Sequence, residues 1–259
     1  MSEGLPGEDC RAVDAGGAKG EGIRAKLKYL VAPLTFRIRE GPLKGARWSP
    51  ASGVRFIRGD FKAEKSQAMD RLLKPGHVVY DVGAHVGYTT VLASRRVGSG
   101  GHVVAFEPRG INLRFLRVHL KANGVENVRV VTSAVGRETG RASFDARRGS
   151  GTGRLSASGA ATVPVLALDD LLAVEDLRPP DFIKVDVEGG EVGVLEGGME
   201  FLRRHEPRLF LATHGPEVEA RCLEILRELG YGWEVLSRGR APGEAELLCS
   251  PGGPESSTS

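Results

Sequence analysis

The spacing of apolar residues becomes regular from about residue 76 onward. Short apolar runs there alternate with segments in which apolar side chains recur every three or four residues, a pattern typical of strands alternating with helices. Strands are expected at HVVYD, HVVAFE, NVRVVTSAV, DFIKVDV, PRLFLATH, YGWEVLS and AELLCS. Helices are expected at GYTTVLASRR, INLRFLRVHLKANG and VEARCLEILRELG, and in a segment with Val192, Leu195, Met199 and Leu202 on one stripe. The alternation predicts an α/β fold with a doubly wound, mostly parallel sheet.

Two parts of the chain do not follow this alternation. LTFRIRE and VRFIRG alternate apolar with basic residues and are expected to form a small antiparallel element, followed by a helix at FKAEKSQAMDRLLKPG. Between residues 141 and 165, ASFDA and TVPVLAL are expected to pair as a hairpin around a Gly- and Ser-rich loop. The predicted organisation is a disordered tail over 1–22, an N-terminal β/α extension over 23–75, a core domain over 76–249 and a disordered tail over 250–259.

Composition excludes several classes of protein. The chain has 259 residues, of which 41% are hydrophobic, and a formal net charge of +3, which is too balanced to indicate nucleic-acid binding by itself. Its three cysteines, Cys10, Cys222 and Cys249, have the spacing of neither a disulfide framework nor a zinc site. Neither an apolar signal segment nor a run of about 18 apolar residues is found, so no membrane span is predicted and a cytoplasmic location is expected. Monomer and homodimer both stay open.

Ligands bind sheets of this kind at the carboxyl ends of the strands. The residues expected at those ends are Asp81, Glu107, Ser133, Ala134, Asp186, Glu188 and His214. The first strand continues into a glycine turn, VVYDVGAHVGYTT, that resembles a dinucleotide fingerprint. His85, however, occupies the place of the glycine that lets a pyrophosphate approach the backbone.

This altered turn favours a ligand without a pyrophosphate. Asp81 would repel phosphates and attract a cation, and S-adenosylmethionine carries an ammonium and a sulfonium against one carboxylate. Glu107 follows Gly83 at close to the roughly 20-residue offset at which an acidic side chain binds ribose hydroxyls. The sequence therefore predicts S-adenosylmethionine as the cofactor.

Five motifs resemble the FkbM family of S-adenosylmethionine-dependent methyltransferases: DVGAHVG, AFEP, TSAVG, LALDDLL and IKVDVEGGEVGVLEGG. The resemblance covers roughly Phe61 to Gly215, and its most specific part is the KxDxEG block, which contains Lys184, Asp186, Glu188 and Gly189. It implies the seven-stranded, Rossmann-like sheet of class I methyltransferases, with a hairpin in place of the third crossover. The implied activity is methyl transfer to a hydroxyl oxygen of a sugar, polyketide or other secondary metabolite.

The same resemblance implies which residues contact the cofactor. Asp81, Gly83, Ala84 and Gly87 would surround the methionine part, and Glu107, followed by Pro108, would hold the ribose. The adenine edge would lie against Ser133 and Ala134. Two further cofactor positions are less regular: His85 stands where the family frequently has Asn, and Glu64 matches a recurrent acidic position.

A hydroxyl acceptor needs a base, and three residues are candidates for this catalytic role. Asp186 is favoured by position at the end of the fourth strand, with Glu188 as a competitor. His214 has an ordinary pKa suited to accepting a proton at neutral pH, although many family members have a glutamate there. Alternative roles stay open: Asp186 as a cofactor-orienting residue, and Glu188 and Glu191 as carboxylates at a helix N-terminus. No metal is assigned, because Asp186 and Glu188 alone are two ligands.

Two features have both a structural and a functional interpretation. Lys184 lies within an apolar strand and is expected to pair with a neighbouring carboxylate rather than transfer protons. The loop over 147–160, with Arg147, Arg148 and Arg154, is either a substrate lid or a solvated hairpin tip.

Several other functions fit the sequence less well. DVEG stands where methyltransferases acting on planar nitrogens have an Asn/Asp-Pro-Pro-aromatic turn, and none of the cysteines follows a proline as carbon methylation by a Pro-Cys nucleophile would require. RNA ribose methylation, an NAD-dependent oxidoreductase and a non-catalytic cofactor-binding protein remain as alternatives. The favoured acceptor is a small molecule with a hydroxyl group, and no nucleic acid is expected.

Overall fold

A seven-stranded sheet forms the centre of the computed structural model, which describes residues 30–59, 63–145, 154–155, 161–173 and 177–254. The strand order is β12-β13-β11-β10-β3-β4-β5, and all neighbours are parallel except for β13, which is antiparallel to both β11 and β12. The strands are β3 (Val78–Val82), β4 (His102–Phe106), β5 (Val128–Val131), β10 (Phe182–Val185), β11 (Arg208–His214), β12 (Tyr231–Arg238) and β13 (Glu244–Pro251). The predicted doubly wound, mostly parallel sheet is confirmed. β13 includes the first two residues of the expected C-terminal tail, whereas residues 255–259 lie outside the described part.

Helices cover both faces of this sheet because successive strand residues point to opposite sides. Val78, Tyr80 and Val82 pack into one core, and Val79 between them packs into the other. The first core includes side chains of α6 (Glu191–Glu196), α7 (Met199–His205) and α8 (Pro216–Glu228). The second includes side chains of α3 (Ala63–Leu72), α4 (Tyr88–Val97) and α5 (Gly110–Ala122). No helix among the described residues has both the length and the apolar character needed to cross a bilayer.

Several expected elements differ from those observed. VRFIRG is not a strand: it forms the helix α2 (Val54–Arg58), bounded by Gly53 and Gly59 with positive φ, and its Phe56 packs against Trp48. The antiparallel element instead pairs β1 (Phe36–Arg37) with β2 (Arg47–Trp48), and η1 (Pro50–Ser52) follows it. The single helix expected after β10 is divided into α6 and α7 at Gly197 and Gly198, and Gly197 lies so close to the backbone carbonyl of Gly136 that a side chain there would collide with it.

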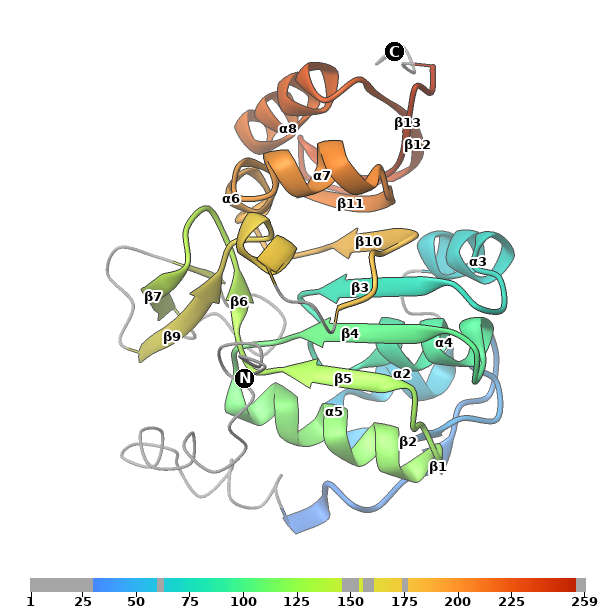
Figure 1. Ribbon diagram of the computed structural model, residues 1–259. Coiled ribbons are helices and arrows are strands. Elements are labelled where there is room, and N and C mark those ends of the chain that lie inside the picture. The colour runs from blue at the N-terminus through green and yellow to red at the C-terminus, as the bar shows by residue number, and fades with distance from the viewer. Residues whose placement is uncertain (1–29, 60–62, 146–153, 156–160, 174–176, 255–259) are drawn as a thin grey trace.

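The expected hairpin forms a second, smaller sheet. β7 (Gly140–Asp145) pairs antiparallel with β9 (Ala161–Leu166) between β5 and β10 in the chain, as predicted, and η2 (Asp169–Ala173) follows β9. The run NVRVVTSAV is divided, because β5 ends at Val131 and β6 (Ala134–Val135) joins this second sheet. Figure 1 shows the arrowheads of β3, β4, β5 and β10 pointing toward the side where β7 and β9 lie. Of the proposed lid loop, only β8 (Arg154–Leu155) is described; 147–153 and 156–160 lie outside the described residues.

His119 joins the N-terminal extension to the core. Its ring is fully buried and stacks on Trp48 at 3.7 Å between centroids. Nε2 accepts a hydrogen bond from the Ser49 backbone N–H at 3.1 Å, so Nδ1 carries the proton and donates to the Val86 carbonyl at 2.7 Å. Burial lowers the pKa of His119 to about 4, against the raising effect of the hydrogen bond to Val86. The folded state therefore requires the neutral imidazole.

We expect this histidine to make the protein less stable in mild acid. The folded pKa of about 4 lies below the unfolded value of about 6.5, so the stabilisation is complete above pH 6.5 and is lost as the pH falls toward 4. The loss between pH 7 and pH 5 is about 2 kcal/mol. Urea unfolding at both pH values measures it, and a His119→Gln variant should lose about 2 kcal/mol less over that interval. Equal losses in both proteins would contradict this role of His119.

Candidate functional site

The glycine turn after β3 lies against the end of β10. Gly83 and Gly87 have φ of 79° and 91°, and His85 between them adopts φ of 53°, an uncommon value for a residue with a side chain. A Cβ at Gly83 would collide with the backbone carbonyl oxygen of Asp186, so only glycine allows this approach. The turn and the KxDxEG segment therefore meet at one edge of the sheet.

Asp81 is paired within the protein. Its side chain is fully buried, accepts a hydrogen bond from Thr90 Oγ1 at 2.6 Å and lies 3.0 Å from Lys184 Nζ. The Lys184 ammonium also donates to the carbonyls of Val82 and Gly83, at 3.1 and 2.6 Å. The expected ion pair of Lys184 is confirmed. The Lys184 ammonium neutralises the Asp81 carboxylate, so the burial of Asp81 does not require a cationic ligand. Contact between Asp81 and the cofactor stays a prediction.

Glu107 is positioned by both the turn and the start of α5. It is 4% exposed, and its carboxylate accepts hydrogen bonds from the backbone N–H groups of His85 at 2.9 Å and Arg109 at 2.8 Å and from Asn112 Nδ2 at 3.2 Å. Burial raises the pKa of Glu107, although these hydrogen bonds and the charge of Arg109 act to lower it. Asn112 was missed from sequence, because its partner is known only once the start of α5 is placed beside the end of β4.

The other residues assigned to the cofactor are placed less directly. Ala84 is buried in the turn, and its N–H donates to the Phe106 carbonyl at 2.9 Å. Ser133 and Ala134 are buried just beyond β5, where Ser133 Oγ donates to the Ala134 carbonyl at 3.0 Å. Pro108 connects Glu107 to the segment before α5. Glu64 is exposed near the start of α3, and its cofactor role stays a prediction.

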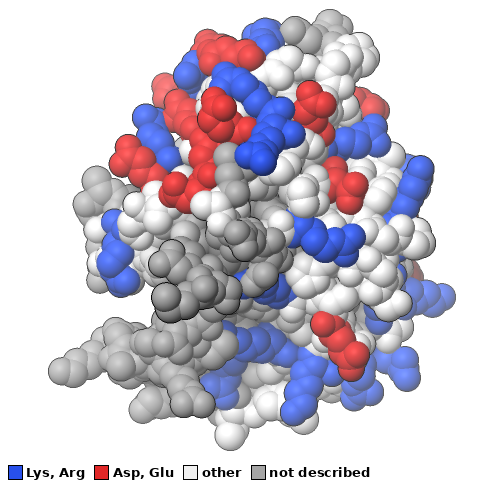
Figure 2. Space-filling view, in the orientation of Figure 1, with Lys and Arg blue, Asp and Glu red and all other residues white. Residues whose placement is uncertain are grey.

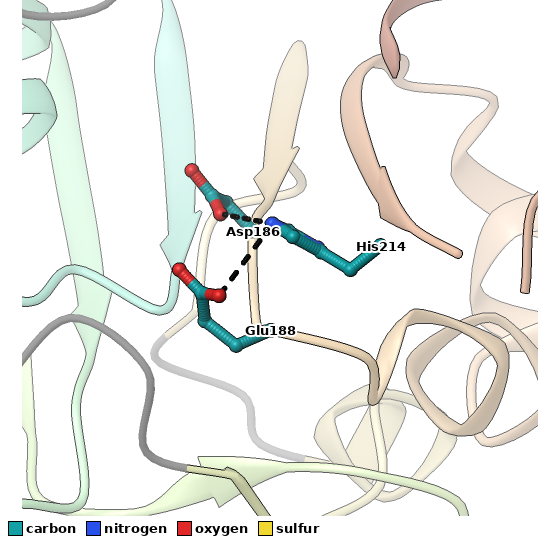
Figure 3. Close-up of side chains that lie close together, drawn as sticks. All are labelled: Asp186, Glu188 and His214. Carbon is teal, nitrogen blue, oxygen red and sulfur yellow. Dashed lines mark ion pairs between the residues drawn. The ribbon is translucent and has the colours of Figure 1, made fainter. Parts of the chain in front are cut away.

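Asp186, Glu188 and His214 come together at the ends of β10 and β11 (Figure 3). His214 Nε2 lies 3.7 Å from Asp186 Oδ1 and 3.7 Å from Glu188 Oε2. Asp186 immediately follows β10, and Glu188 is turned back by a left-handed backbone conformation with φ of 57°. All three catalytic candidates from the sequence thus lie in one cluster.

Glu191 fixes the orientation of the His214 ring. Its carboxylate is fully buried, and Oε1 accepts from the backbone N–H groups of Val187 and Gly189 and contacts His214 Nδ1 at 2.8 Å. Glu191 therefore lies at the N-terminus of α6, as predicted, and in addition it orients the His214 ring. Burial lowers the pKa of His214, but the hydrogen bond and charge of Glu191 and the charges of Asp186 and Glu188 outweigh it and raise the pKa. His214 therefore holds its proton more firmly than the ordinary value assumed from sequence.

Lys65 contributes from α3 and was missed in the sequence. Its buried ammonium lies 2.9 Å from Asp186 Oδ2 and 2.9 Å from Glu246 Oε2, so it joins α3 and β13 to the end of β10. The signal was present: Lys65 occupies a helical stripe with the apolar residues Ala68, Met69 and Leu72. A lysine at such a position needs a buried partner.

Comparison with known proteins places this chain in a family. A family model described as the methyltransferase FkbM domain matches residues 81–232. A hexuronic acid methyltransferase of Haloferax volcanii is 29% identical over 151 residues, which cover 56% of this chain and 58% of that protein. A ribosomal RNA large subunit methyltransferase E of an Azoarcus species is 44% identical over 57 residues, covering 22% and 27% of the two chains. The matched region thus covers little more than half of the hexuronic acid methyltransferase and about a quarter of the ribosomal RNA methyltransferase.

The fold is also found in a solved structure. The crystal structure of a methyltransferase FkbM from Methylobacillus flagellatus aligns with a TM-score of 0.51 and 17% identity, covering 87% of this chain and 59% of that one. At this identity the likeness concerns the fold alone. It agrees with the α/β sheet described above.

Proposed function

This chain belongs to the FkbM methyltransferase family, and from that premise we propose that it transfers a methyl group from S-adenosylmethionine to a hydroxyl oxygen of a small molecule of the sugar class. One observation carries the proposal. The turn at Gly83, next to the expected cofactor side chain Glu107, packs directly on Asp186, the first residue of the acidic and histidine cluster. Cofactor binding and proton transfer from an acceptor therefore have neighbouring places at one sheet edge.

The residues around the turn fit an adenosine-containing cofactor. Glu107 Oε1 accepts two hydrogen bonds and Oε2 accepts one among the described residues, which leaves Oε2 able to accept another from a ribose hydroxyl. His85 carries a side chain where a pyrophosphate would need bare backbone, so a nicotinamide dinucleotide fits less well. When bound, S-adenosylmethionine supplies a methyl group on a sulfonium.

The cluster beside the turn supplies the chemistry that a hydroxyl acceptor needs. Asp186 Oδ1 and Glu188 Oε2 lie on either side of His214 Nε2, and a hydroxyl held there can donate its proton to a carboxylate, or to His214 Nε2 when the imidazole is neutral. Lys65 and Glu191 keep Asp186 and His214 in place, so orienting the acceptor requires little rearrangement of the protein.

The sugar class is favoured by the hexuronic acid methyltransferase, because the region of likeness to it covers more than half of this chain. A ribose hydroxyl of RNA is the second candidate, and the short match to a ribosomal RNA methyltransferase is its support. The surface in Figure 2 mixes both charges, with acidic residues gathered toward the end that contains α6 and α8 in Figure 1. Among the described residues of this face, the charged side chains away from that end are mostly basic, but uncharged ones separate them, and a continuous basic surface, as RNA binding would favour, is not seen.

Radioactive methyl transfer tests the proposal. S-adenosylmethionine with a tritiated methyl group is incubated with the protein and with hexuronic acids, neutral glycosides, polyketide alcohols or a ribosomal RNA fragment. We expect label in a sugar and matching release of S-adenosylhomocysteine. Label in RNA alone would select the second candidate, and tight NAD binding without S-adenosylmethionine binding would overturn both.

Replacing His214 by alanine should separate chemistry from cofactor binding. Because the variant removes Nε2 from the cluster and leaves the turn intact, we expect kcat to fall about 100-fold and the Kd of S-adenosylmethionine to stay within about threefold. His205→Ala, in α7 outside the cluster, is the matched control. Steady-state kinetics and calorimetry give the two values, and an unchanged kcat would exclude a role for His214.

A further inference from the structure

The side chains in Figure 3 present three different donor atoms to one small volume. One potential ligand atom from each of Asp186, Glu188 and His214 lies within 4.8 Å of the others, and His214 Nε2 is 3.7 Å from both Asp186 Oδ1 and Glu188 Oε2. Around one cation with bonds of about 2.1 Å, neighbouring ligands are about 3 Å apart and opposite ligands about 4 Å apart. The two 3.7 Å separations therefore need to contract by less than about 1 Å to hold a single ion, and the two carboxylates need to move by no more than that if they are opposite ligands.

His214 is held as metal-binding histidines are. A histidine ligand almost always donates its second ring N–H to a carboxylate or carbonyl, which fixes the tautomer and directs the other nitrogen at the metal. The fully buried Glu191 contacts Nδ1 at 2.8 Å, so Nε2 is the nitrogen directed at Asp186 and Glu188. Glu191 is itself fixed by the N–H groups of Val187 and Gly189, which makes this orientation rigid.

Asp186 is oriented by a second buried partner. Lys65 Nζ contacts Oδ2 at 2.9 Å and is held on its other side by Glu246 at the same distance. This leaves Oδ1 as the oxygen that faces His214. Two of the three donors are thus fixed by the buried charged groups Lys65 and Glu191, from α3 and α6, and Lys65 is held in turn by the partly buried Glu246 of β13, which together form the supporting shell that a metal site requires.

We propose that Asp186, Glu188 and His214 bind one divalent cation that accepts both imidazole nitrogen and carboxylate oxygen, with Mn²⁺ as the representative ion. Three protein ligands leave coordination positions open for an acceptor. The mixed donor set differs from the all-oxygen environment of six to eight ligands that Ca²⁺ prefers. The sequence alone offered two carboxylates, and the tertiary structure adds the nitrogen ligand.

The role of the cation in catalysis rests on the proposed function. A sugar offers a hydroxyl with a second oxygen on the adjacent carbon, and both can occupy the open positions. The bound hydroxyl then loses its proton more readily, because the cation stabilises the resulting alkoxide. The negative oxygen so formed is the stronger nucleophile for a methyl group, and the proton leaves to solvent or a nearby carboxylate.

Mn²⁺ titration followed by electron paramagnetic resonance tests the site without any cofactor or acceptor. The full chain is treated with EDTA, desalted and titrated, and loss of the free Mn²⁺ signal measures binding. We expect saturable binding of one ion, weakened about 10- to 100-fold in Glu188→Gln, His214→Ala and Glu191→Gln. Glu217→Gln, an exposed carboxylate at the start of α8, is the matched control and should bind as the unaltered chain does.

Glu188→Gln keeps this test valid if the more buried variants do not fold, because Glu188 is the most exposed of the three ligands. Circular dichroism of each variant identifies those that fold. Absence of saturable Mn²⁺ binding, or equal binding by the unaltered chain and folded Glu188→Gln, overturns the proposed site.

Methyl transfer before and after chelation separates this inference from the proposed function. Transfer that falls at least about tenfold with EDTA and returns with Mn²⁺ supports both. Transfer at the same rate after chelation overturns the catalytic role of the cation and leaves the methyltransferase proposal standing. Saturable Mn²⁺ binding that the ligand variants lose, without methylation of any acceptor, supports the cation site and counts against the proposed function alone.

Discussion

Replacing Lys184 by methionine is expected to lower the free energy of unfolding by about 3–5 kcal/mol. The variant leaves the fully buried Asp81 carboxylate without the ammonium that lies 3.0 Å from it. An uncompensated charge in such a place is far more destabilising than the pair is stabilising. The carbonyls of Val82 and Gly83 lose their donor as well, so the turn should loosen and bind the cofactor more weakly. Urea unfolding gives the stability, and calorimetry with S-adenosylmethionine gives the Kd.

A double variant distinguishes the unpaired charge from lost packing. Asp81→Asn combined with Lys184→Met removes both charges, and we expect it to regain most of the stability lost in Lys184→Met. Lys121→Met on the exposed side of α5 is the control and should change the stability by less than about 0.5 kcal/mol. A double variant as unstable as the sum of its two single variants would contradict an ion pair as the dominant interaction.

Replacing Glu107 by glutamine should weaken S-adenosylmethionine binding roughly 100-fold or more. A hydrogen bond from a ribose hydroxyl to a carboxylate contributes about 1.5–3 kcal/mol, which is about 10- to 100-fold in Kd. In the native protein the N–H groups of His85 and Arg109 donate to the Glu107 carboxylate. Glutamine would place its NH₂ group against one of these N–H donors, and the two facing donors would disturb the turn. Calorimetry with S-adenosylmethionine and S-adenosylhomocysteine measures the change.

Glu126→Gln is the matched control for this experiment, because it makes the same substitution at an exposed position after α5. Thermal unfolding of both variants shows whether lost affinity comes from lost folding. A folded Glu107→Gln variant with the affinity of the unaltered chain would remove the cofactor site from this turn, and with it the geometric basis of the proposed function.

The two acidic strand ends look alike in sequence but have different surroundings. We expected both carboxylates to meet a ligand, because a buried charge needs a partner. Asp81 finds its partner in Lys184, which lies opposite it in the register of β3 and β10. Glu107 is held by N–H donors and retains acceptor capacity. Which strand lies beside which is a property of the topology, so no local pattern could separate the two roles.

The sequence pattern predicts the wrong element where a short segment can form either a strand or a helical turn. Val54–Arg58 alternates as a strand does, but positive φ at Gly53 and Gly59 and the burial of Phe56 against Trp48 select one helical turn. Among the acidic and basic residues of α3, Glu64 resembled a family position, whereas Lys65 is the residue that contacts Asp186. Neighbouring helix positions point about 100° apart, so only the packing of α3 decides which of them faces the site.

The sequence by itself determined the order and type of the core elements, the doubly wound sheet and the strand ends at which Asp81, Glu107, Asp186 and His214 lie. These follow from side-chain periods of two and 3.6 residues, which are local and can be read along the chain. Only the tertiary structure decided which charges pair, that Lys65 and Glu191 orient the cluster, and that His214 joins Asp186 and Glu188. Such contacts join residues far apart in sequence, and their partners are set by which strands become neighbours.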